Sequence, residues 1–139
     1  MPTRLELQEL AEKKLLAIKA LFEKEFYDFV CHECGYVLEY GLKSAVCKYV
    51  RKTVYPENTR GYKTHNLNDL VSLSNLNSSL EKRKSESTEF FINWSIVSTW
   101  TVGFRYDPIG KNKKNTAEEY INAIESKKDG AFPWIKENW

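Results

Sequence analysis

The stretch FYDFVCHECGYVLEYGLKSAVCKYV, residues 26–50, decides the fold of this chain. Its apolar and small residues recur at steps of three and four, as residues on one side of an α-helix do. They are Val30, Cys34, Val37, Leu38, Gly41, Leu42, Ala45, Val46 and Tyr49. A stripe this broad is typical of a helix that neighbouring helices bury. The pattern predicts one long helix from about Phe26 to Arg51.

Helical spacing also occurs before and after this stretch. Residues 3–22 carry an apolar stripe among many charged residues, and Lys24-Glu25 forms a short break. Residues 54–66 contain Pro56, Asn58 and Gly61, which favour a loop. A third helix is then expected from His65 to about Lys84, because leucines recur there at helical spacing.

The second half of the chain is less regular. Residues 90–106 fit both a strand and a helix, and we favour a helix because the run is much longer than a strand of ~5–6 residues. After a polar loop over 107–115, Thr116 and Glu119 form a capping box that opens another helix. Gly130 ends that helix, and Pro133 suits the first turn of an additional short helix over 133–139.

Composition and length place these helices in one globular unit. The chain has 139 residues, of which 42% are hydrophobic and 29% charged. It has no secretory signal pattern and no apolar run near the ~20 residues of a membrane span. We therefore expect a cytoplasmic protein without membrane contact. Its fold class is all-α, an up-and-down bundle of about five helices in a single domain over residues 1–139.

The charge is uneven although the net charge is only +2. Residues 1–42 carry a net charge of −3, whereas residues 43–65 carry +5. Further basic runs lie at 82–84 and 111–114. The positive stretches are explained either by solvated helix ends and loops or by contact with phosphate or nucleic acid.

The three cysteines include a C-x-x-C pattern at Cys31 and Cys34. Structural zinc needs four ligands, and Cys47 lies about 20 Å further along the same predicted helix. Thioredoxin-type redox chemistry needs a strand before the motif, and none is predicted. We therefore expect small buried cysteines that pack as apolar residues, with no metal site and no cofactor.

The 26–50 helix resembles the second helix of the HEPN domain family, which typically carries an aromatic–Asp pair and a Glu four residues before a Lys. Here these are Tyr27-Asp28 and Glu39 with Lys43. THNLNDLV (64–71) resembles the start of the third family helix, and FRYDP (104–108) resembles the end of the fourth. The resemblance covers roughly residues 5–126.

The resemblance implies a small helical bundle that pairs with a second copy across two long helices. Some members are metal-independent ribonucleases, often toxins of toxin–antitoxin pairs, with an Arg-x4–6-His motif. Others lack the motif and bind nucleotides, RNA or a partner nucleotidyltransferase. An apolar surplus on the second and fourth predicted helices also favours a homodimer.

Arg60 and His65 satisfy Arg-x4-His literally. A histidine can take the proton of a ribose 2′-OH, and an arginine can hold the scissile phosphate. Gly61 follows the arginine, however, and Leu67 stands where toxin members have a tyrosine. His65 is then either a catalytic base, a residue satisfied by local hydrogen bonds at a helix start, or a ligand contact without catalysis.

These observations lead to one functional prediction, one enzymatic alternative and a third hypothesis, a purely structural interaction domain for a separately encoded nucleotidyltransferase. We predict an accessory module that binds nucleotide or RNA, is partnered with a nucleotidyltransferase, and has no catalytic centre. Its predicted ligand contacts are Arg105, Tyr106, His65 and Lys43. Glu39 is expected only to form a helix-stabilising i, i+4 pair with Lys43. The alternative is a metal-independent endoribonuclease that uses Arg60 and His65.

Overall fold

The computed structural model describes residues 1–139 and contains seven α-helices and one 3₁₀ helix. In chain order they are α1 (Arg4–Glu23), α2 (Tyr27–Tyr49), α3 (Leu67–Leu73), α4 (Asn77–Glu86), α5 (Thr88–Val97), η1 (Val102–Tyr106), α6 (Lys114–Glu125) and α7 (Ala131–Asn138). The predicted all-α class is confirmed. The helices outnumber the predicted five because two expected helices are interrupted. None of them is both long enough and apolar enough to cross a membrane.

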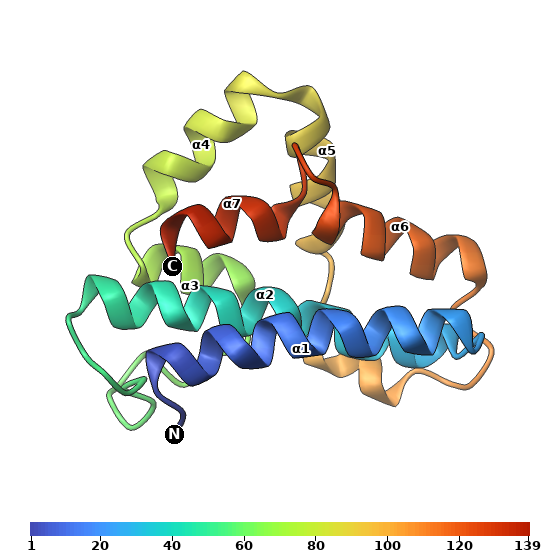
Figure 1. Cartoon of the computed structure of the whole chain (residues 1–139), viewed down its shortest axis with the longest axis horizontal. Coiled ribbons are helices and arrows are strands. Elements are labelled where there is room, and N and C mark those ends of the chain that lie inside the picture. The colour runs from blue at the N-terminus through green and yellow to red at the C-terminus, as the bar shows by residue number, and fades with distance from the viewer.

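The second helix is the central element of the bundle. α1 and α2 run antiparallel side by side, α6 and α7 lie over them, and α4 and α5 extend away at the far edge (Figure 1). α2 contacts α1, α3, η1, α6 and α7. Of its 23 residues, 16 are buried, which confirms the broad buried stripe seen in the sequence except at its last member, Tyr49, which is exposed. α7 shares this core through Phe132, Trp134 and Ile135.

The third predicted helix is wrong as a single element. The stretch from His65 to Lys84 divides into α3 and α4 around Ser74–Leu76, where Asn75 has a φ of 59°. Asparagine tolerates this left-handed conformation better than most residues do. The Ser74 hydroxyl donates to the Val71 carbonyl and so ends α3 with a local hydrogen bond. Leucine periodicity continues across the break and conceals it.

The predicted helix over 90–106 is correct only in its first half. α5 ends at Val97, and residues 98–101 leave the helix before η1 begins. The Thr99 hydroxyl donates to the Ile96 carbonyl at 2.7 Å. Trp100 turns inward instead of continuing the helix, and its indole Nε1 donates to the carbonyls of Cys31 and His32 at 3.1 and 3.3 Å. A long-range anchor on α2 thus overrides the local helical pattern.

The last two helices begin earlier than expected. α6 starts at Lys114, so Thr116 lies inside its first turn and the predicted capping box is wrong. α7 starts at Ala131, and Pro133 lies in its first turn as predicted. Gly130 precedes it in a tight position, where an added Cβ would lie 2.5 Å from the Ser126 carbonyl oxygen.

Candidate functional site

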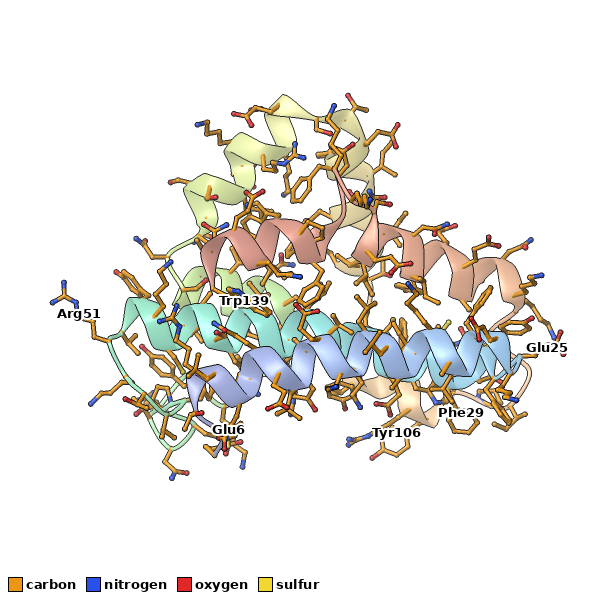
Figure 2. All side chains as sticks on the ribbon, in the orientation of Figure 1. Glu6, Glu25, Phe29, Arg51, Tyr106 and Trp139 are labelled. Atoms are coloured by element: carbon orange, nitrogen blue, oxygen red, sulfur yellow. The ribbon has the colours of Figure 1, made fainter.

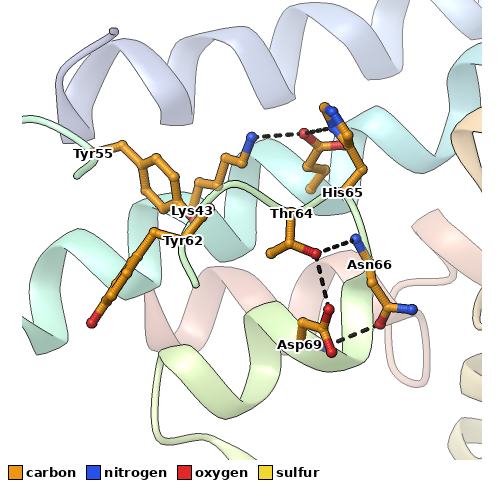
Figure 3. A network of polar contacts seen from close by, with 8 residues as sticks. Lys43, Tyr55, Tyr62, Thr64, His65, Asn66 and Asp69 are labelled. Carbon is orange, nitrogen blue, oxygen red and sulfur yellow. Dashed lines mark hydrogen bonds and ion pairs between the residues drawn. The ribbon is translucent and has the colours of Figure 1, made fainter. Parts of the chain in front are cut away.

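A buried carboxylate on α2 joins two residues that are far apart in the sequence. Glu39 is 2% exposed, and its Oε1 accepts hydrogen bonds from Lys43 Nζ at 2.8 Å and from His65 Nδ1 at 2.9 Å. Figure 3 shows Lys43 and His65 reaching the same carboxylate beside α2. The predicted Glu39–Lys43 pair is confirmed, but it is buried and shared rather than a surface pair.

The segment before α3 places His65 against this carboxylate. Asn66 caps α3 by accepting from the Asp69 N–H, and Thr64 donates from its hydroxyl to Asp69 (Figure 3). Further back, the Tyr55 hydroxyl donates to the Tyr62 carbonyl at 2.7 Å and closes the loop. These bonds hold residues 55–66 along α2, so His65 reaches a partner 26 residues away. Its hydrogen bond is therefore not the local one considered for a helix start.

The ring orientation of His65 follows from its partner. An ionised carboxylate only accepts hydrogen bonds, so Nδ1 carries the proton that points to Glu39. The opposite nitrogen, Nε2, is left for solvent or a ligand, and the His65 side chain is 55% exposed. A histidine oriented by a buried carboxylate in this way can accept a proton from a bound hydroxyl.

Lys43 is enclosed on the other side of Glu39. Its side chain is 9% exposed, and its ammonium lies 5.1 Å from the centre of the Tyr55 ring as well as on Glu39. The second carboxylate oxygen of Glu39, Oε2, is buried and has no hydrogen-bond partner in the protein. The ligand contact predicted for Lys43 stays a prediction, since its ammonium would have to leave Glu39 to make it.

Arg60 does not join this cluster through any contact. It is exposed on the loop beside Gly61, which has a φ of 89°, and it forms no ion pair. The structure thus brings His65 to Glu39 and Lys43, not to a fixed arginine.

Arg105 and Tyr106 lie together at the end of η1. The Arg105 guanidinium carbon is 4.9 Å from the centre of the Tyr106 ring, and Tyr106 is 77% exposed. Figure 2 shows Tyr106 projecting from the edge of the molecule. Trp100 fixes this element, because its indole packs edge-on against Tyr36 of α2 at 5.1 Å between ring centres. No contact joins the Arg105–Tyr106 pair to His65 or Lys43.

Asp28 organises the loop that follows η1, a role that the sequence analysis did not predict. Its carboxylate accepts from the backbone N–H groups of Gly110 and Asn112 at 2.7 and 2.9 Å. These two hydrogen bonds lower the pKa of Asp28 below its usual value. The signal available in the sequence was an acidic residue beside the apolar stripe of α2, and the same signal applies to Glu39.

The cysteines are buried on α2, as predicted. Burial raises the pKa of Cys31 to about 12, and it also raises the pKa of Cys34. Both thiols therefore stay protonated near neutral pH, whereas nucleophilic and metal-binding cysteines react as thiolates. No three His, Cys, Asp or Glu side chains converge as metal ligands.

The fold and this cluster define a class: an all-α bundle around a nearly buried second helix that carries a Glu–Lys pair. The model of the HEPN domain family matches residues 5–126, and the chain belongs to that family. The match ends at α6, so α7 lies beyond it. Comparisons with curated proteins and with solved structures found no match.

Proposed function

We propose that this HEPN protein is a cytoplasmic accessory module that binds a nucleotide or RNA at η1 and has no catalytic centre. The observation that carries the proposal is the exposed Arg105–Tyr106 pair, with the guanidinium 4.9 Å from the ring centre. A tyrosine this exposed offers a face on which a base can stack. The neighbouring arginine supplies a fork of donors for phosphate.

The rigid support of η1 strengthens this assignment. Trp100 anchors the start of the element on α2, and Asp28 holds the following loop through Gly110 and Asn112. An exposed pair held at both ends loses less conformational entropy on binding than a pair on a free loop. Arg60 lies on a glycine-containing loop without such support.

A second candidate function is metal-independent RNA cleavage, and the orientation of His65 favours it. Glu39 holds Nδ1, which leaves Nε2 as a base for a ribose 2′-OH. The phosphate-holding arginine would have to be Arg60, which forms no contact with this cluster. We therefore place this function second.

The partners are also proposals. A homodimer would use the outer face of α5, where Phe91 and Ile92 are exposed, rather than α2, which is covered within its own chain. A separately encoded nucleotidyltransferase is the proposed second partner, on the basis of family membership alone.

Fluorescence anisotropy with a short labelled RNA and with a labelled nucleotide tests the η1 site. Tyr106→Ala should weaken binding by about tenfold or more, since a base–aromatic stack contributes ~1–3 kcal/mol. Tyr106→Phe keeps the ring and should bind nearly as the wild type does. Arg105→Ala should weaken binding more than Arg60→Ala. Equal binding by all four variants would refute the site.

Incubation of a labelled mixed-sequence RNA in chelator separates the two functions. We expect no cleavage above background by the wild type. Cleavage that falls by ~100-fold in His65→Ala, the usual contribution of a general base, would establish the ribonuclease in its place.

A further inference from the structure

A pocket of about 500 Å³ lies where the start of α1 meets the end of α2. Four of its eight lining residues are cationic: Arg4, Lys48, Arg51 and Lys52. The others are Thr3, Leu5, Cys47 and Thr53, so no acidic residue lines it. Figure 2 shows Arg51 at the end of α2, on the side of the molecule that also carries Glu6.

The cations of this pocket pair with no Asp or Glu side chain. None of the four lies within ion-pair distance of an Asp or Glu carboxylate, although eight other Lys or Arg side chains form such ion pairs. Arg4 donates from Nη2 to a backbone oxygen of Trp139, the last residue of the sequence, at 2.9 Å, while its Nε is buried without a partner.

Helix dipoles do not account for this charge. The carbonyl end of α2 carries roughly −0.5 charge, and the N-terminal end of α1, which meets it here, carries roughly +0.5. The two nearly cancel, so the four side chains leave the pocket strongly positive. The backbone around the pocket is held in place, because the Arg4 N–H donates to the Thr53 carbonyl at 2.8 Å and joins the loop after α2 to the start of α1.

Arg51 occupies a position that favours glycine. It follows the end of α2 with a φ of 56°, and its N–H and that of Lys52 donate to the carbonyls of Lys48 and Cys47. This is the hydrogen-bond pattern of a Schellman motif, whose left-handed residue is usually glycine because a Cβ is disfavoured there. An arginine at this position adds a positive charge at the rim of the pocket (Figure 2) at a cost to the backbone.

We infer that this pocket binds an oligophosphate chain, such as the di- or triphosphate of a nucleotide or an inorganic oligophosphate. One phosphate monoester carries only about −1.5 to −2 charge near neutral pH, which four cations exceed. A volume of about 500 Å³ is within the range of small-molecule sites, and four of the eight lining residues are cationic, which suits a polyanion. The inference is independent of the η1 site, because Tyr36, which contacts the η1 anchor, lies roughly 22 Å along α2 from Arg51.

Isothermal titration calorimetry with sodium tripolyphosphate, in chelator at fixed ionic strength, tests this inference. The double variant Lys48→Gln/Lys52→Gln should weaken binding by about tenfold or more, as expected when charge-assisted hydrogen bonds are lost. The matched control Lys127→Gln/Lys128→Gln removes two exposed lysines near α7 and should bind within about twofold of the wild type. Arg105→Ala should also leave this binding unchanged, which separates this site from the one on η1.

Arg51→Gly is the sharper variant, since its effects on binding and stability should be opposite. Binding of tripolyphosphate should weaken, while the midpoint of thermal unfolding stays equal or rises. A nucleoside triphosphate, the matching nucleoside and an RNA oligomer without a 5′-phosphate identify the source of the phosphate chain. Absence of tripolyphosphate binding to the wild type, or binding unchanged in Arg51→Gly and the double variant, overturns the inference. So does binding of the RNA oligomer alone.

Discussion

Removing one partner of the Glu39–Lys43 pair should destabilise the protein much more than removing both. In Glu39→Leu the ammonium of Lys43, whose side chain is 9% exposed, loses its carboxylate. Breaking a buried pair from one side costs about 3–5 kcal/mol. In Lys43→Met the carboxylate keeps the hydrogen bond from His65, so the cost should be lower, about 2–3 kcal/mol.

The free energy of unfolding of the double variant Glu39→Leu/Lys43→Met should lie within about 1 kcal/mol of the wild-type value, because the double variant leaves no uncompensated charge. The coupling energy between the two sites should then exceed about 3 kcal/mol. Urea unfolding followed by circular dichroism measures this directly. With a slope of about 1–3 kcal/mol per molar urea, Glu39→Leu should shift the midpoint by at least about 1 M.

Lys82 and Glu86 on α4 provide the matched control for this cycle. They have the same i, i+4 spacing, but their N–O distance is 3.8 Å and both side chains are exposed. Their coupling should stay below about 0.5 kcal/mol. Single variants at Glu39 and Lys43 that each cost less than 1 kcal/mol and simply add in the double variant would refute the buried-pair argument.

Two further predictions concern the supports of η1. Gly35→Ala should destabilise the protein by more than about 3 kcal/mol, because the new Cβ would lie 1.8 Å from Cδ2 of Trp100. A free energy of unfolding within about 1 kcal/mol of the wild-type value would contradict this. Asp28→Asn should cost about 1–3 kcal/mol at pH 7 by weakening the bonds from Gly110 and Asn112. Because the pKa of Asp28 is lowered in the folded protein, its contribution is present above the unfolded value of about 3.9 and is lost as the pH falls through the lower folded value. The difference in free energy of unfolding between wild type and variant should therefore shrink as the pH falls below about 4, and a difference that stays constant in urea unfolding at acidic pH would refute this.

The sequence alone determined the central helix, the all-α class and the family. The helical spacing over 26–50 arises because one side of the helix is buried. The spacing is the same whichever segments cover that side, so the sequence alone shows it. Spacing within this helix also predicted that the cysteines are buried and that Glu39 and Lys43 form an i, i+4 pair. Helix ends were less predictable, since the capping-box pattern at Thr116 lies inside α6.

Only the tertiary structure decided which partners the polar residues of the helices contact. The end of α5 depends on Trp100 reaching the carbonyls of α2, and the environment of His65 depends on Glu39, 26 residues away. The cationic pocket likewise needs Arg4 from the start of α1 beside Lys48 and Arg51 from the end of α2. Such contacts form between segments distant in the chain, and their free energy comes from burial and charge pairing that no local pattern encodes.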